Sequence, residues 1–250
     1  MEFVLINPGS FILGKFQPTY PIPKEPQNEG NKTGQQRGYN AAEYTLARQL
    51  AQEDAMPGFT VTIARPFYIG KFEVTQAQWQ QVMGTNPSVF QGKAVKDDAG
   101  KHPAENITWN DAQAFVKKLN QLEGGKIIYR LPTEFEWEYA ARAGAQDDIS
   151  WEEIRLAAQM GLSTTAQVGQ KKANAWGLYD MLGNVWEWVE DYYNEKIFAD
   201  PTPPKSGKAH VLKGASFVGD VKNATYMTHA AGPGNGWDVG FRVVMEIKDK

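Results

Sequence analysis

The sequence contains no cysteine and only 3 histidines among its 250 residues. Without cysteine the chain can form no disulfide, no thiolate metal site and no thiol nucleophile. The histidines, His102, His210 and His229, lie in separate segments, whereas a mononuclear iron or copper site usually combines two histidines with a carboxylate. A histidine-rich metal centre is therefore not expected, and His102, which precedes Pro103, is expected in a loop near the surface.

Strong net charge and long apolar runs are also missing. The formal net charge is -3 and the pI is about 5.7, which gives no electrostatic footprint for nucleic acid or an anionic membrane. No apolar run approaches the length of a membrane span, and no signal peptide is visible. With 42% hydrophobic residues the chain can bury a sizeable core, so one domain over residues 1–250 is predicted.

The most unusual segment of the chain is 174–188, which concentrates large aromatic, acidic and glycine residues. Trp and Tyr can fill a core that has little regular structure, while their N–H and O–H groups satisfy loop carbonyls. Gly177 and Gly183 would let the backbone turn beside those rings, where a Cβ would not fit. This composition predicts a rigid centre built from loops.

This segment stands between Arg-Leu-Pro-Thr-Glu-Phe-Glu-Trp at 130–137 and the later motifs Lys-Gly-Ala-Ser-Phe at 213–217 and Gly-Phe-Arg at 240–242. In this order the motifs resemble the formylglycine-generating enzyme family, also called the sulfatase-modifying-factor family. The resemblance implies an α+β domain with the formylglycine-generating-enzyme fold, related to the C-type lectin-like fold and low in regular secondary structure. A fold of this kind does not by itself define a function.

Met1 stands directly before the first family motif. In exported relatives that motif follows a leader, so a periplasmic or exported location is expected if a leader was removed upstream of Met1. The absence of cysteine does not decide the compartment, because such a protein survives in oxidising and reducing spaces alike.

The interval 15–58 is polar and rich in proline and glycine, and it includes a helix-favouring stretch at 41–53. The family usually bridges this interval with fewer residues, so we predict an insertion here. A long loop in a compact domain is often functional. The insertion is a candidate partner-binding or site-covering element, and a solvated surface ornament is the alternative.

Residues 2–13, 59–69 and 70–73 have the pattern of strands. Helices are predicted after Thr75, Thr108 and Thr133, because a threonine N-cap with a polar residue three positions on forms a capping box. The interval 147–162 is also expected to be helical.

Glycine residues mark the expected helix ends at Gly124 and Gly144. In the third helix, three glutamates are expected to act as caps and as ion-pair partners of Arg130 or Arg142 rather than as acid–base groups: Glu134, Glu136 and Glu138.

The resemblance also implies a calcium site, held by the carbonyls of Leu182, Gly183 and Val185 and the carboxylate of Glu187. Calcium accepts backbone carbonyls in a flexible shell of oxygen ligands. The alternative is that Glu187 pairs with a buried arginine such as Arg242 and holds no ion. A second calcium site of the family is not carried over, because the matching carboxylate pattern is absent from 147–162.

Formylglycine formation in the family uses two cysteines that bind copper and activate oxygen. Here the corresponding positions are Gly219 and Ala224, which offer no metal ligand. Copper binding is therefore not expected, and formylglycine-generating activity is excluded. Ser216 keeps its family position, but arginines that relatives carry after this motif are thinned out.

The rebuilt segment is polar and aromatic, a composition that suits recognition of a protein or a polar small molecule. Its candidate ligand-binding residues are Ser216, Asp220, Asn223, Tyr226, His229, Trp237 and Asp238. His229 could also carry protons in catalysis, although a lone histidine is more often structural.

Two classes of function follow. The first is a non-catalytic binding or accessory protein, which the loss of both cysteines and of the pocket arginines favours. The second is an enzyme of different chemistry, such as an oxidoreductase resembling the periplasmic relatives that mature the pyoverdine chromophore. The ergothioneine sulfoxide synthases of the family need an additional iron-binding helical domain, for which this chain has no room.

Overall fold

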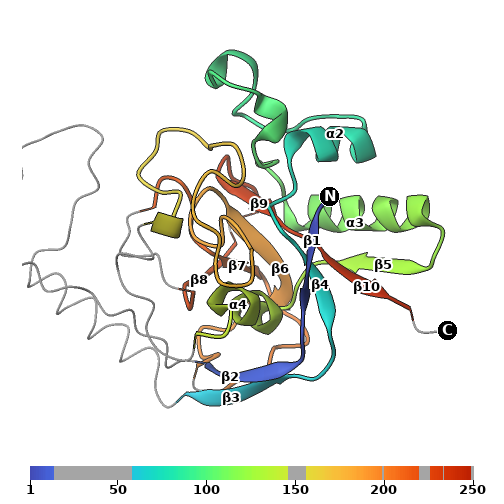
Figure 1. Ribbon diagram of the computed structural model, residues 1–250, viewed down its shortest axis with the longest axis vertical. Helices are drawn as coiled ribbons and strands as arrows, with labels where there is room; N and C mark the ends of the chain where they lie inside the picture. Colours follow the sequence, from blue (N-terminus) through green and yellow to red (C-terminus); the bar gives the residue numbers. More distant parts are fainter. Residues whose placement is uncertain (14–57, 146–155, 199, 220–225, 233, 249–250) are drawn as a thin grey trace, which may run out of the picture.

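A computed structural model of the chain describes residues 1–13, 58–145, 156–198, 200–219, 226–232 and 234–248. These residues form small sheets and short helices joined by long loops (Figure 1). The α+β architecture with little regular secondary structure confirms the predicted fold class. Among the described residues, no helix is both long enough and apolar enough to cross a membrane.

The first sheet joins the two ends of the chain. Its order is β1 (Phe3–Ile6), β4 (Phe67–Gly70), β10 (Val244–Ile247) and β5 (Ile127–Arg130), and all of its neighbours are antiparallel. Since β10 lies between β4 and β5, the last described strand is needed to complete a sheet that begins with the first.

A two-stranded ribbon, β2 (Gly9–Leu13) with β3 (Phe59–Ile63), flanks the predicted insertion. Leu13 lies opposite Phe59, so the two ends of the interval meet side by side. Of the predicted insertion only Gly58 is among the described residues, so its structure and the single-domain prediction stay untested.

The strand predictions were too long at two places. Residues 2–13 form two strands separated at Asn7 and Pro8, and 59–69 form two strands separated at 64–66, which includes Pro66. Proline has no N–H to contribute to a ladder, so it is found at strand ends. The strand predicted at 70–73 was also wrong, because Gly70 already ends β4.

The third sheet has the order β8 (His229–Ala231), β7 (His210–Lys213), β6 (Trp186–Tyr192) and β9 (Val239–Phe241). β9 runs parallel to β6, whereas the other two pairs are antiparallel. Helix α4 (Glu134–Arg142) packs against β6 and β7 (Figure 1). This sheet therefore carries the loops that precede β9 and follow β7, where the predicted site residues lie.

Three helices begin at the predicted capping boxes. Helices α2 (Gln76–Met83), α3 (Trp109–Glu123) and α4 each have a threonine N-cap with both reciprocal bonds present. Helix α3 ends at Gly124 as predicted, whereas α4 ends at Ala143, with φ of 49°, one residue before the predicted Gly144. Short 3-10 turns, η1 (Gly92–Ala94) and η2 (Ala99–Lys101), lie between α2 and α3.

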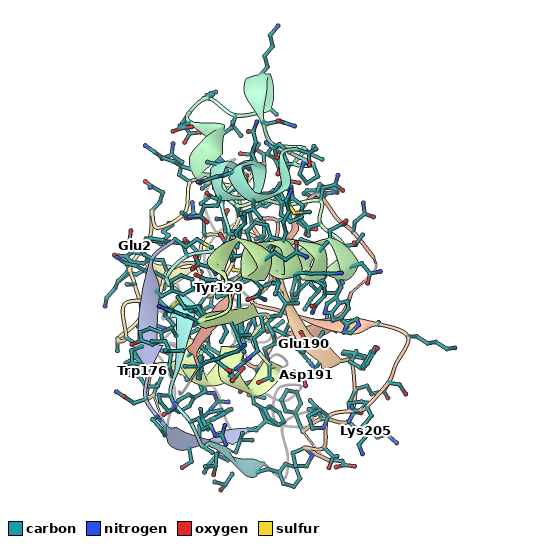
Figure 2. The ribbon with its side chains drawn as sticks, turned by 90° about the vertical axis from the view of Figure 1, so that its right-hand side faces the viewer. Glu2, Tyr129, Trp176, Glu190, Asp191 and Lys205 are labelled. Atoms are coloured by element: carbon teal, nitrogen blue, oxygen red, sulfur yellow. The ribbon has the colours of Figure 1, made fainter. Side chains whose placement is uncertain are left out.

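Helix α3 covers β5, as Figure 2 shows with Tyr129 beneath the helix. The Asn120 side chain donates to the Tyr129 carbonyl at 2.8 Å and accepts from the Tyr129 N–H at 2.7 Å. Two backbone groups of a short strand are thereby satisfied by one helix residue.

In the segment predicted as a loop-built centre, 174–185 contain no helix or strand, as expected, whereas 186–188 begin β6. At Gly177 the predicted lack of room for a Cβ is wrong, because no atom lies within 4 Å of a Cβ built there, although φ is 84°. Trp188 is 2% exposed, and its Nε1 donates to the Ile107 carbonyl at 2.8 Å. Gly183 has φ of 86°, and a Cβ there would lie 2.3 Å from the Gln159 carbonyl oxygen. The helix predicted at 147–162 does not reach residue 162. Within the described part of this interval only 156–157 are helical, and Gln159 forms an isolated bridge with Gly183.

Candidate functional site

Glu187, at the start of β6, lies in a fully buried ion pair with Arg242. Arg242 donates from Nε and Nη2 to the two carboxylate oxygens at 2.7 and 2.6 Å, and Trp137 Nε1 donates at 2.7 Å. The guanidinium also donates to the carbonyls of Gly70 and Tyr179, both at 3.0 Å. This is the alternative to calcium that the sequence left open.

Two further carboxyl groups neighbour this pair. Burial raises the pKa of Glu73 well above its usual range and the pKa of Asp180 to about 6. Glu73 accepts from the Asn184 side chain at 2.7 Å and from the Val185 N–H at 3.1 Å. The network therefore ties the central loop to the sheets, and its role is structural.

The predicted calcium ligands do not fit the ion as they are placed. Both oxygens of Glu187 are taken by N–H donors, and the Leu182 carbonyl accepts from the Gln159 N–H at 2.9 Å. An ion at Glu187 would also stand beside the Arg242 cation. Calcium is bound within this family, but no cluster of three or more acidic or histidine side chains placed to hold a metal is found among the described residues.

The second group of functional candidates gathers where loops from four parts of the chain meet. We call it the aromatic–acidic site, and it consists of Phe90, Glu105, Ser216, Phe217, Trp237 and Asp238. Three of its members were predicted from the sequence: Ser216, Trp237 and Asp238. The structure brings these three together.

Ser216 and Asp238 are held together by the ends of two neighbouring strands. After β7 the chain turns through Gly214 and Ala215, both with positive φ, and Ser216 becomes buried. Its Oγ donates to Asp238 Oδ2 at 2.8 Å. The Asp238 carbonyl accepts from the Trp186 N–H at 2.8 Å, which fixes the loop before β9 to β6.

Glu105 supplies a second carboxylate, which the sequence analysis missed. Its residue is 0% exposed, and Oε1 accepts from the Phe90 N–H at 2.8 Å. Oε2 is buried and makes no hydrogen bond within the described part of the chain. Burial, with a smaller contribution from nearby Asp238, raises the pKa of Glu105 to about 7.

Three aromatic rings stand beside these carboxylates. Phe217 lies 5.3 Å from both Phe90 and Trp237, measured between ring centroids, and Phe90 lies 6.0 Å from Trp237. Trp237 is 46% exposed, and the neighbouring Val89 and Val218 are 51% and 48% exposed. Val89, Val218 and Trp237 therefore form an apolar, partly exposed rim beside the two carboxyl groups of the site.

Tyr226 and His229 contact other groups. Tyr226 is buried in the hydrophobic core. His229 Nδ1 lies 3.2 Å from Glu134 Oε1, and its ring lies between Tyr193 and Phe198 at centroid distances of 5.1 and 5.0 Å. Asp220 and Asn223 lie outside the described residues, so their part in a site stays a prediction.

The predicted roles of the helix α4 glutamates are partly confirmed. Glu136 pairs with Arg130 at 2.6 Å, and Glu138 pairs with Arg142. Glu138 also lies 3.1 Å from Lys213 Nζ, and the surrounding cations lower its pKa in spite of burial. Glu134 has no arginine partner among the described residues and instead faces Lys213 and His229.

His102 was expected in a surface loop, and this was wrong. The residue is 2% exposed, its Nδ1 lies 3.0 Å from Thr165 Oγ1 and its Nε2 lies 2.8 Å from Asp97. Neighbouring loops cover it, a tertiary effect that the residues beside it do not encode.

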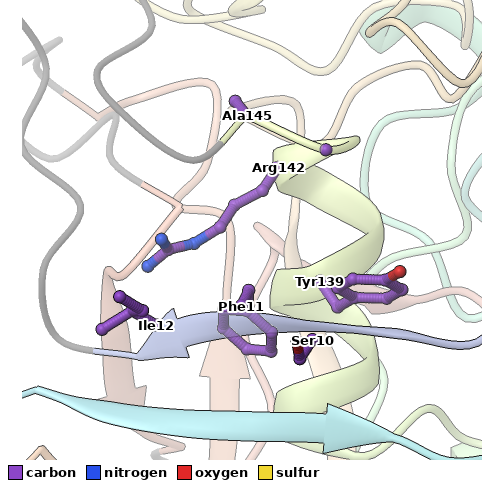
Figure 3. Close-up of a pocket in the computed structure, with 7 residues that line it drawn as sticks. Ser10, Phe11, Ile12, Tyr139, Arg142 and Ala145 are labelled. Carbon is purple, nitrogen blue, oxygen red and sulfur yellow. The ribbon is translucent and has the colours of Figure 1, made fainter.

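Two hollows elsewhere in the molecule do not suit a larger buried ligand. One, lined by Arg142, Phe11 and Ile12 among others (Figure 3), has a volume of about 20 Å³, enough for a water molecule. Figure 3 shows Arg142 reaching from α4 toward β2, with its guanidinium carbon 5.1 Å from the Phe11 ring. The other is a shallow, open depression of about 640 Å³ between α3 and β5.

Comparison with known proteins places this geometry in a family. The model of the sulfatase-modifying factor enzyme 1-like domain matches residues 1–247. The chain is 31% identical over 235 residues to the chaperone protein LppX of Paenibacillus barcinonensis, across 71% of this chain and 79% of that protein. It is 36% identical over 166 residues to the formylglycine-generating enzyme of Streptomyces coelicolor, across 56% of this chain and 50% of that enzyme.

A solved structure shows the same fold. The structure of PvdO from Pseudomonas aeruginosa superposes with a TM-score of 0.70 over 98% of this chain and 94% of that one. The identity is 23%, so this likeness shows the fold alone. The relation to C-type lectins stays a prediction. The chain belongs to the sulfatase-modifying factor, or formylglycine-generating enzyme, family, as a divergent member that lacks the catalytic cysteines.

Proposed function

We propose that this chain is a non-catalytic binding or accessory protein that recognises a protein partner at the aromatic–acidic site. The observation that carries the proposal is Trp237, a 46% exposed tryptophan that packs on Phe90 and Phe217 and directly precedes Asp238. Exposed aromatic residues next to apolar neighbours are typical of interaction surfaces.

The chemistry of the site supports binding over catalysis. Gly219 and Ala224 replace the two cysteines, and no thiol exists elsewhere in the chain. Ser216 is hydrogen-bonded to an aspartate, and within the described part of the chain no histidine is bonded to it that could act as a base toward it. His229, the one candidate proton carrier of the segment, faces Glu134 instead.

A relative named as a chaperone supports an accessory role. The name of LppX describes a protein that acts on another protein, and this chain covers 79% of it. A polar small molecule is the alternative ligand, and Val89 and Val218 make it the weaker choice, because exposed valines add apolar contact that a small polar ligand does not need.

Affinity capture with matched variants tests the proposal. Trp237→Ala is expected to reduce capture of the partner from a lysate of the source organism by about tenfold or more, since tryptophan is enriched among interface hot spots. Leu122→Ala, which removes a 66% exposed side chain on α3, is the control and should leave capture unchanged. Equal capture by both variants and the unaltered chain would contradict the proposal.

The sequence predicts calcium at Leu182, Gly183, Val185 and Glu187, but the ion pair of Glu187 with Arg242 disfavours this prediction. We expect calorimetric titration of the chelator-treated protein with Ca²⁺ to give no heat and no change in melting temperature, because the ion would have to displace a buried guanidinium. A saturable heat together with stabilisation would show that the ion does displace it.

A further inference from the structure

We infer that the aromatic–acidic site selects a basic side chain, lysine or arginine, of the protein partner. This inference rests on the proposed binding function and names the group that the site recognises. It is carried by two carboxyl groups without an ion-pair partner among the described residues, one buried oxygen without a hydrogen bond there, and the exposed indole of Trp237, which directly precedes Asp238.

The first observation is the unsatisfied oxygen of Glu105. A buried carboxylate oxygen without a hydrogen bond costs about 1–3 kcal/mol or more. Oε1 is satisfied by the Phe90 N–H, whereas Oε2 has no partner at hydrogen-bond geometry among the described residues, although the Val89 N–H is near enough to lower the pKa of the carboxyl group. Because Glu105 is 0% exposed, a basic side chain of a partner could donate to Oε2 only if the covering side chains moved, and it would otherwise act on the carboxyl group through its charge.

The second observation is that the two acidic groups lack a cation. Within the described ranges, neither Glu105 nor Asp238 has an ion-pair partner, and Asp238 is bonded to a neutral hydroxyl at Oδ2. Two buried carboxylates elsewhere are paired, Glu187 with Arg242 and Glu138 with Arg142 and Lys213, whereas Glu73 and Asp180 resemble Glu105 in having no ion-pair partner among the described residues. Among the described residues, therefore, no cation neutralises Asp238 or, when it is ionised, Glu105.

The third observation is the position of Trp237. A cation over an exposed indole face gains about 0.5–1 kcal/mol or more, and the apolar stem of lysine or arginine packs on neighbouring side chains. Phe90 and Phe217 hold the indole from the protein side, and Val218 extends the apolar rim. An anionic group such as phosphate would be repelled by the carboxylates, and this repulsion excludes an anionic ligand.

Paired probes that differ only in charge test the inference. The probes are N-acetyl-arginine amide and N-acetyl-citrulline amide, which have nearly the same shape. The readout is the indole N–H cross peak of Trp237 in nuclear magnetic resonance spectra, identified by its loss in Trp237→Phe. The arginine probe is expected to shift this peak with a Kd on the order of millimolar, and the citrulline probe to bind about tenfold more weakly.

Two isosteric variants locate the charge. Glu105→Gln keeps an acceptor for the Phe90 N–H, and Asp238→Asn keeps one for Ser216. Each is expected to weaken binding of the arginine probe by about fivefold or more. Glu195→Gln, which neutralises an exposed carboxylate outside the site, should leave it unchanged.

The failures are distinguishable. The inference is overturned if the arginine probe produces no shift, if the citrulline probe binds as tightly as the arginine probe, or if both isosteric variants bind the arginine probe with unchanged affinity. If capture of the partner still depends on Trp237 in that case, the proposed binding function stands. Capture that does not depend on Trp237 overturns the proposed function whatever the probes do.

Discussion

Glu105 lies in an environment that favours the neutral form of its carboxyl group. Burial raises its pKa to about 7 from a usual 4.5, so the folded state retains a proton that the unfolded state has released between these values. The free energy of unfolding therefore falls as pH rises from about 4.5 to about 7. Asp180 and Asp191, each with a pKa raised to about 6, act in the same direction.

Glu105→Gln tests this linkage by removing the titrating group while keeping its shape. At pH 8 the variant is expected to be more stable than the unaltered chain by on the order of 1–2 kcal/mol, less than the full pKa shift would give because the rim of the site is open to solvent. At pH 5 the two should differ little. Chemical denaturation at both values measures this, and an identical difference at pH 5 and pH 8 would count against it.

Arg242 is the residue on which the buried core network depends. Arg242→Met leaves the Glu187 carboxylate uncompensated and is expected to cost on the order of 3–5 kcal/mol of unfolding free energy. Adding Glu187→Gln to this variant should recover part of the loss, because it removes the stranded charge. A double variant less stable than Arg242→Met alone would show that the pair is not coupled in this way.

The sequence predicts those residues whose role depends on near neighbours in the chain. Thr75, Thr108 and Thr133 cap helices because the partner of each lies three positions on. Glu105 could not be identified in this way, since its environment is made by loops distant in sequence. The same reason explains why His102 was misplaced and why His229 is not part of the predicted pocket.

At the scale of elements, the β2–β3 ribbon allows the contribution of the predicted insertion to stability to be tested. Leu13 and Phe59 are directly paired, so a two-residue Asn-Gly turn can replace residues 14–58 without moving either strand. The shortened protein is expected to keep its melting temperature within a few degrees, because the β2–β3 pairing and the core clusters of the described residues are all kept. A calorimetric scan checks this, and loss of the cooperative transition would show that the interval belongs to the core.

The same variant separates two roles of the interval. Capture of the partner that is unchanged after replacement would assign recognition to the aromatic–acidic site alone. Weakened capture would add the interval to the recognition surface.

The prolines at positions 8 and 66 show why the ends of strands are poorly predicted from the sequence. The alternation of apolar residues continues across these prolines, while the hydrogen-bond ladder does not.

At the scale of the whole molecule, the family fold is kept while the chemistry of its site is replaced. The motif order, the loop-built core and the match over residues 1–247 agree on the fold. The positions of the thiols now carry glycine and alanine, and the aromatic–acidic site has an exposed tryptophan and two carboxyl groups without an ion-pair partner among the described residues. We therefore expect this molecule to use an enzyme scaffold to recognise a protein partner.

Site-directed photo-crosslinking tests this claim most directly. A photoreactive amino acid is placed at Val89 or Val218 on the rim of the aromatic–acidic site, and at Leu122 on α3 as the control, each an exposed position. The account predicts the same protein adduct from both rim positions, none from Leu122, and loss of the rim adducts when Trp237→Ala is added. Equal adducts from Leu122, or rim adducts that persist in Trp237→Ala, would contradict it.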